Sequence, residues 1–150
     1  MTEIETATDA RARAIALVRD YYAAFNRGDH AGMVALMTDE VAHDLNEGDR
    51  EIGKDAFLRF MQRAASCYDE HLREVTVLAS DDGHRAAAEY VVYGSYIGTD
   101  AGLPPAKGQR YAVPGGAFFT IAHGEDGSVR IARVTHYYNL QNWVTQVNGA

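Results

Sequence analysis

Four side chains capable of acid–base chemistry are spread along the chain: Tyr21, Asp44, Glu89 and His136. Carboxylates and imidazoles can transfer protons near neutral pH, and a phenol can donate a hydrogen bond to an oxygen that becomes negative during a reaction. With His43, three of these residues also belong to the types that bind zinc or iron(II). The histidines show no HxH, HxxxH or HExxH spacing, so a metal site would form only if the fold brought these residues together.

Alternation along the predicted strands indicates which of these side chains face the interior. In the last strand, His136 and Tyr138 alternate with a more polar set of residues, so we expect both to point inward. Glu89 lies in a strand that is apolar on both faces, which predicts a raised pKa or an ionic partner for its carboxyl group. In a short strand early in the chain, alternation places His43 inward and Asp44 outward.

The elements that would position these residues are helices in the first third of the chain and strands in the remainder. Apolar residues at helical spacing predict one helix that ends at Gly28, a short second helix around residues 33–37 and a third helix that begins near Gly53. Apolar runs separated by turns predict strands over residues 41–46, 73–79, 86–97, 110–123 and 129–140. We expect residues 114–116, Pro-Gly-Gly, to interrupt the fourth strand as a bulge or bend.

This order of elements, helices first and then an antiparallel meander, is typical of an α+β fold. We predict a cone-shaped α+β barrel in which three N-terminal helices pack on a strongly curved, mostly antiparallel sheet. Such an arrangement would enclose a cavity for a small molecule. The loop over residues 98–109 is long enough to cover that cavity as a lid or to contact a partner.

Length and composition limit the classes of protein to consider. The 150 residues suit a single domain, with residues 1–10 as a loose N-terminal segment. The net charge of −7 disfavours nucleic acids and anionic membranes as partners, and no apolar run approaches the roughly 18 residues of a membrane span. The single cysteine, Cys67, allows no internal disulfide, and the acidic N-terminus is unlike a signal peptide, so we expect a cytoplasmic protein.

Four segments of the chain together resemble a known superfamily: Tyr21–Asp29, Asp39–Asp44, Gly53–Phe57 and Arg130–Asn139. The series is similar to that of the nuclear transport factor 2-like superfamily, in the branch of the ketosteroid isomerases and the SnoaL-like polyketide cyclases. The resemblance extends over residues 12–145. It implies the cone-shaped fold, a homodimer and a small-molecule substrate, although the same fold also occurs in ligand-binding modules.

The resemblance also implies roles for individual residues. In ketosteroid isomerases an Asp removes a proton next to a carbonyl group, while a Tyr and a protonated Asp stabilise the enolate oxygen. The matching base and tyrosine are Asp44 and Tyr21, which places Asp44 at the cavity against the alternation of its strand. The protonated Asp falls on Ala117, and the acid of the SnoaL-like cyclases falls on Asn139, so both acids are replaced. Glu89 or His136 would then have to act as the second acid.

Three functions are consistent with these residues. The first is a cofactor-independent acid–base enzyme that isomerises, cyclises or dehydrates a small carbonyl-bearing or polycyclic molecule, with catalytic groups Tyr21, Asp44, Glu89 and His136. The second is a non-catalytic module that binds a small ligand or a partner, and the third is a metal-dependent enzyme that uses His43, Glu89 and His136. The predicted substrate-binding residues are His43, Asn46, Tyr93, Phe119, Tyr138 and Trp143. The expected homodimer surface is the outward set of the last strand: Arg133, Thr135 and Tyr137.

Overall fold

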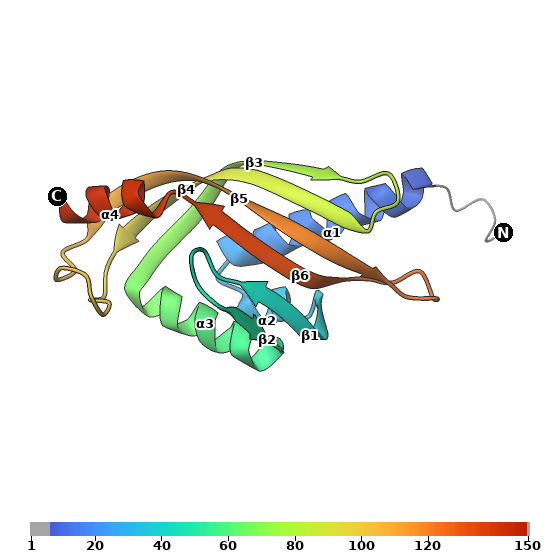
Figure 1. Ribbon diagram of the computed structural model, residues 1–150, viewed down its shortest axis with the longest axis horizontal. Coiled ribbons are helices and arrows are strands. Elements are labelled where there is room, and N and C mark those ends of the chain that lie inside the picture. Colours follow the sequence, from blue (N-terminus) through green and yellow to red (C-terminus); the bar gives the residue numbers. More distant parts are fainter. Residues whose placement is uncertain (1–6, 150) are drawn as a thin grey trace.

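The computed structural model describes residues 7–149, in which one sheet is surrounded by helices (Figure 1). The helices are α1 (Ala7–Asn26), α2 (His30–Val34), α3 (Lys54–Cys67) and α4 (Leu140–Asn148). The strands are β1 (Met37–Asp44), β2 (Arg50–Ile52), β3 (Tyr68–Ala79), β4 (Arg85–Tyr96), β5 (Gln109–His123) and β6 (Val129–Tyr138). The predicted α+β class is confirmed, with α4 as an additional helix at the C-terminal end. The predicted loose segment is helical from Ala7, and residues 1–6 lie outside the described range.

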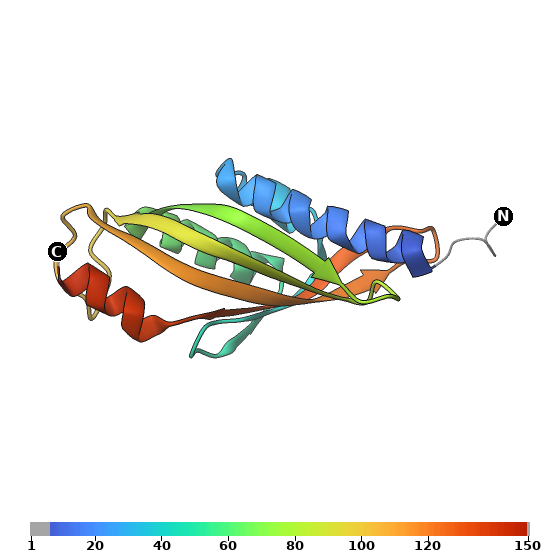
Figure 2. The same cartoon turned by 90° about the horizontal axis from the view of Figure 1, so that it is seen from above.

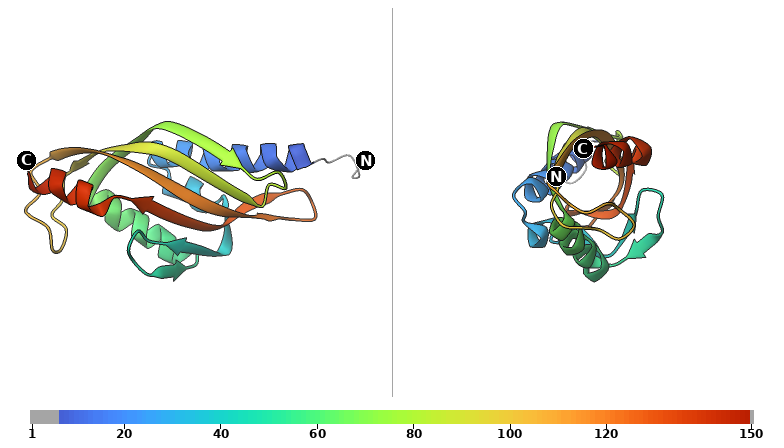
Figure 3. Two further views of the ribbon diagram at one scale, coloured as in Figure 1. Left: turned by 45° about the horizontal axis from the view of Figure 1, so that its top comes forward. Right: turned by 90° about the vertical axis from the view of Figure 1, so that its left-hand side faces the viewer.

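The six strands form a curled, unclosed sheet with the order β2-β1-β6-β5-β4-β3. β1 and β6 run parallel, and all other neighbouring strands run antiparallel. Viewed end-on, the sheet curves around the interior and the first three helices complete the circle (Figure 3). α1 packs along β3, β4 and β6, whereas α4 packs on β5 at the opposite end of the molecule (Figure 2).

Local sequence explains where the helices begin and which faces they bury. On α1, the buried residues between Ala14 and Tyr22 recur at helical spacing and form the apolar stripe that packs against the sheet. Asp29 caps α2, because its Oδ1 accepts a hydrogen bond from the backbone N of Gly32 at 2.9 Å. Gly53 precedes α3 with a φ of 101°, a conformation that favours glycine.

Several element boundaries differ from the predictions. The second helix stops at Val34, because β1 begins at Met37 to pair with β6, and the predicted extension to residue 37 is wrong. The chain passes from α3 into β3 at Tyr68, so β3 begins five residues before the predicted strand at 73. The predicted interruption of β5 is also wrong, since its pairing with β4 continues in register through residues 114–116. Pro114 is tolerated there because pairing with β6 ends at Gly115, which leaves the proline only one neighbouring strand.

The buried residues form two clusters. The larger cluster lies between α1, α3 and the sheet, and the smaller one contains Tyr96, Tyr111, Val113 and Val147 near α4. None of the helices within residues 7–149 combines the length and the hydrophobicity that a transmembrane helix requires.

Candidate active site

A cavity of about 420 Å³ lies inside the curve of the sheet and is lined by members of both buried clusters. This volume lies within the usual range of small-molecule sites. Nine of its lining side chains are Phe, Tyr or Trp, and they come from α1, α3, α4 and strands β3 to β6. Five predicted site residues reach this cavity: Tyr21, Asn46, His136, Tyr138 and Trp143.

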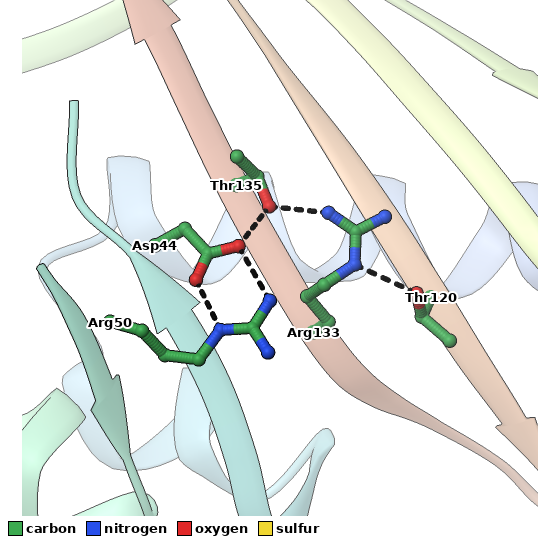
Figure 4. Close-up of polar contacts among 5 residues, drawn as sticks. All are labelled: Asp44, Arg50, Thr120, Arg133 and Thr135. Atoms are coloured by element: carbon green, nitrogen blue, oxygen red, sulfur yellow. Dashed lines mark hydrogen bonds and ion pairs between the residues drawn. The ribbon is translucent and has the colours of Figure 1, made fainter. Parts of the chain in front are cut away.

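Asp44 does not reach the cavity, because it lies on the outer face of the sheet (Figure 4). Its carboxylate accepts hydrogen bonds from Arg50 Nε at 2.6 Å, Arg50 Nη2 at 3.0 Å and Thr135 Oγ1 at 2.6 Å. The bonds from Arg50 are the main reason that the pKa of Asp44 falls to about 2. The expected place of Asp44 at the cavity is therefore wrong. The structure agrees instead with simple alternation along β1, in which His43 points inward and Asp44 points outward.

The same outer face holds Arg133 and Thr135, two of the residues expected at a dimer surface. Arg133 donates from Nε to Thr120 Oγ1 at 2.9 Å and from Nη1 to Thr135 Oγ1, which connects it to Asp44 (Figure 4). The third residue, Tyr137, is 57% exposed and packs edge-on against Phe118. The homodimer stays a prediction.

Glu89 and Tyr93 also point outward, because the inner face of β4 is formed by Ala88, Tyr90 and Val92. Glu89 is exposed and pairs across the sheet with Gly116 and Thr76, so the expected apolar setting of its carboxylate is wrong. Tyr93 is 40% exposed and stacks under the guanidinium of Arg73, so its expected place in the cavity wall is wrong as well.

Phe119 and His43 are buried behind the cavity wall. Phe119 is fully buried against Tyr21, with ring centroids 5.7 Å apart, so it supports the wall but does not line it. His43 lies behind His136 with ring centroids 5.0 Å apart, and neither nitrogen of His43 has a hydrogen-bond partner in the described part of the chain. Burial lowers the pKa of His43 to about 4 and that of His136 to about 3, so both imidazoles are neutral at pH 7.

The structure does not assemble the predicted metal set. His43 and His136 are neighbours, but Glu89 lies on the opposite face of the sheet. Within residues 7–149, no three His, Cys, Asp or Glu side chains come together in a way that could hold a metal ion. The metal-binding hypothesis based on these three residues is therefore wrong.

Sequence reasoning missed the carboxylate that does face the cavity, Glu70 on β3. The hydroxyl of Tyr111 on β5 donates a hydrogen bond to Glu70 Oε2 at 2.5 Å. Burial raises the pKa of Glu70, and this hydrogen bond opposes the rise. The ring of Tyr111 reaches β3 by crossing Gly94, since a Cβ at Gly94 would lie 2.3 Å from Cζ of Tyr111. A glycine inside a strand often marks a close approach of another group, so Gly94 was the feature of the sequence that could have indicated this contact.

A second carboxylate, Asp100, lines the cavity from the loop between β4 and β5. The hydroxyl of Tyr68 donates to Asp100 Oδ2 at 2.6 Å. The backbone N of Asp100 donates to the hydroxyl of Tyr96 at 2.9 Å, and that hydroxyl donates to the carbonyl of Pro104 at 2.7 Å. These bonds fasten the loop that was predicted as a lid or a partner contact, and they bring an acidic group into the wall.

Comparison with known proteins agrees with this architecture. Residues 18–134 match the model of the SnoaL-like domain. The chain belongs to the SnoaL-like domain family. Among curated proteins, none matches this SnoaL-like sequence.

Several solved structures are similar to this SnoaL-like protein over most of its length. A "putative polyketide cyclase" from Xanthomonas campestris pv. campestris is 55% identical, with a TM-score of 0.87 and coverage of 92% of this chain and 98% of that chain. A "putative polyketide cyclase" from Pseudomonas putida KT2440 is 50% identical, with a TM-score of 0.84 and coverage of 89% of this chain and 97% of that chain. A more distant structure, a "putative SnoaL-like polyketide cyclase" from Jannaschia sp. CCS1, is 18% identical with a TM-score of 0.74 and coverage of 93% and 94%, and it supports the fold alone.

Proposed function

We propose that this SnoaL-like protein is an acid–base enzyme that moves a proton on a small carbonyl-bearing or polycyclic molecule, with Glu70 as the group that takes up and returns the proton. The observation that carries the proposal is a carboxyl group in the wall of an aromatic cavity, hydrogen-bonded to Tyr111 at 2.5 Å. Burial raises the pKa of Glu70 toward the range in which a carboxylate exchanges protons at neutral pH. Two solved structures with 55% and 50% sequence identity to this chain carry the name "putative polyketide cyclase", and that name is consistent with this reaction class.

The proposed chemistry begins at a carbon next to a carbonyl group. Ionised Glu70 takes the proton, and the electron pair of the C–H bond moves to the carbonyl oxygen to give an enolate. Where the substrate carries a carbon–carbon double bond conjugated with this enolate, protonated Glu70 then returns the proton to the far carbon of that double bond, which moves the double bond into conjugation with the restored carbonyl group and isomerises the substrate. Alternatively, the enolate carbon attacks a second carbonyl of the same molecule, which closes a ring, and Glu70 protonates the new alkoxide. Each sequence regenerates the carboxylate, so the proposal requires no cofactor.

Phenols close to Glu70 supply the hydrogen bonds that the enolate would need. Tyr90 and Tyr138 line the cavity, and the negative charge of Glu70 contributes to the raised pKa of both phenols. The pKa of Tyr90 is raised to about 12, mainly by burial, so this hydroxyl keeps its proton at neutral pH. Neutral His136 and Tyr21 line the cavity farther along β6 and α1, where they can donate to other oxygens of the ligand.

Deuterium exchange on a simple ketone tests the proposal without knowledge of the natural substrate. 2-Tetralone, a bicyclic ketone with a benzylic carbon next to its carbonyl group, would be incubated with the protein in D₂O, and deuterium uptake next to the carbonyl group would be followed by mass spectrometry. We expect exchange above the buffer rate and a loss of roughly 100-fold or more in the Glu70→Gln variant. Glu74→Gln is the matched control, since it removes a carboxylate from the exposed side of the same strand. Equal exchange by the Glu70→Gln variant and the wild type would refute the role of Glu70.

A non-catalytic binding module is the second candidate, and three positions favour it. Asp44 is held by Arg50 and Thr135 outside the cavity, and Ala117 is buried with no group that could donate a proton. Asn139 accepts a hydrogen bond from the backbone N of Asn142 at 3.0 Å, which makes it the cap of α4. Saturable binding of 2-tetralone without exchange above the buffer rate would support this candidate over the enzyme.

A further inference from the structure

The end of the cavity next to α4 is a corner made of three aromatic rings. Trp143 on α4 packs against Tyr68 with ring centroids 5.4 Å apart at 71°, and against Tyr111 with centroids 5.9 Å apart at 85°. All three side chains line the cavity. These contacts are edge to face, so the three rings meet at this end of one continuous cavity that all of them line.

Both carboxylates of the cavity belong to this corner. Glu70 accepts a hydrogen bond from Tyr111, and Asp100 accepts one from Tyr68. A phenol that donates to a carboxylate gains electron density in its ring, which strengthens the attraction of the ring face for a cation. Among the residues that the structure describes, neither carboxylate has an ion-pair partner.

The charge of the cavity wall is therefore negative. Of its lining residues, Arg63 alone carries a positive charge, and its guanidinium lies over the ring of Phe60, 5.5 Å from the centroid. His136 is neutral at pH 7, because burial lowers its pKa to about 3. An anionic ligand group would meet two carboxylates at the α4 end, whereas a cationic group would meet two carboxylates and three aromatic rings.

We propose that this corner binds an alkylated ammonium group of the ligand, of which trimethylammonium is the simplest example. Aromatic walls surround the methyl groups of such a cation, and the carboxylates balance its charge. An organic cation fits better than a metal ion, because no three metal-ligating side chains converge within residues 7–149. The inference rests on the proposed function only in taking this cavity as the substrate site, and it narrows the substrate class to molecules that carry a cationic amine.

A purely structural role is the competing explanation, in which the two Tyr–carboxylate pairs only fasten the loop and the strands. Such a role does not distinguish a charged ligand from a neutral ligand of the same shape. Choline and 3,3-dimethylbutan-1-ol form the required pair of probes, because a quaternary carbon replaces the quaternary nitrogen. Trp143 is the single tryptophan of the chain, so its fluorescence reports directly on this corner.

The experiment is a fluorescence titration of the full chain with both probes. We expect saturable binding of choline at least tenfold tighter than that of the alcohol. Glu70→Gln and Asp100→Asn should each weaken choline binding at least fivefold and leave the alcohol unaffected. Glu125→Gln, which removes the same charge from the exposed turn after β5, should change neither affinity.

The proposal would be overturned if the wild-type protein bound choline and the alcohol equally well, or if choline gave no saturable signal. This comparison uses the wild-type protein alone, so it holds even if a variant fails to fold. Unchanged affinity ratios in well-folded Glu70→Gln and Asp100→Asn would also overturn it. The titration measures binding and involves no turnover, so a negative result would leave the proposed proton transfer by Glu70 untouched. A lack of ketone exchange, in turn, would not predict the ratio of the affinities for choline and the alcohol.

Discussion

Removing the hydroxyl group of Tyr111 should raise the pKa of Glu70 further. Burial raises that pKa in the wild type, and the hydrogen bond from Tyr111 opposes the rise by stabilising the ionised form. A hydrogen bond to a charged group contributes about 1.5–3 kcal/mol, and about 1.4 kcal/mol corresponds to one pKa unit. We therefore expect the Tyr111→Phe variant to raise the pKa of Glu70 by about one to two units.

The pH profile of ketone exchange measures this change. A higher pKa leaves less of Glu70 ionised at a given pH, so exchange below the wild-type pKa should fall by roughly 10- to 100-fold. Exchange should recover at high pH, where Glu70 is ionised in both proteins. The midpoint of the profile should thus move upward while the plateau stays similar. A carbon NMR titration of the carboxyl groups, with Glu70→Gln to assign the resonance, would measure the same midpoint directly.

Tyr68→Phe is the matched control for this experiment. It removes another phenol from the same corner, but that hydroxyl donates to Asp100. The midpoint for Glu70 should therefore move by no more than about 0.3 unit, well below the effect of losing a direct hydrogen bond. An unchanged or lowered midpoint in Tyr111→Phe would refute the reasoning, as would an equal rise in both variants.

Three further variants test the rest of the site. Gly94→Ala should displace the ring of Tyr111, since the new Cβ would lie 2.3 Å from Cζ. The midpoint of the exchange profile should therefore move upward, as in Tyr111→Phe. The variant should also lose about 1–3 kcal/mol of stability, measured by urea unfolding. Asp44→Asn should retain exchange and lower the Tm by only a few degrees. The stability due to Asp44 should be present above its ordinary pKa near 3.8 and be lost as the pH falls toward about 2, because the native pKa is lowered. Tyr137→Asp places a charge on the exposed outer face and should shift the proposed homodimer toward monomer, as measured by light scattering; a particle of unchanged mass would contradict that interface.

The fold was predictable from the sequence because its signals are local and repeated. The stripe on α1, the cap at Asp29 and the apolar runs of β4 and β5 each specify one element, and their order determines the class. α4 was missed because Asn139 provides a cap that is visible only when the preceding strand is known to end at Tyr138. β2 was missed because three residues show no usable alternation.

The site was less predictable, because its key contacts cross the sheet. Glu70 becomes a cavity residue only when β3 begins at Tyr68, and the predicted strand began at residue 73. Its partner Tyr111 lies 41 positions away and reaches it across Gly94, a relation that no short spacing reveals. For Asp44, in contrast, strand alternation alone predicted the outward orientation that the structure has, and the role implied by the family resemblance led to the wrong prediction that it faces the cavity. The register of β1 with β6 supports alternation.

Asp44 and Glu70 carry the same functional group, and their environments give them opposite properties. The bonds from Arg50 and Thr135 engage both oxygens of Asp44, and they lower its pKa to about 2. To accept a proton from carbon, Asp44 would have to give up these bonds, so at neutral pH it is a poor base even if a ligand could reach it. Within the described chain, Glu70 has one side-chain hydrogen-bond partner, the phenol of Tyr111. Burial destabilises the ionised form of Glu70, so protonation removes an unfavourable buried charge, whereas the ionised form of Asp44 is stabilised by its partners. A carboxylate that gains from protonation inside an aromatic cavity is the better candidate for proton transfer, and for this reason the proposed chemistry is assigned to β3 and not to β1.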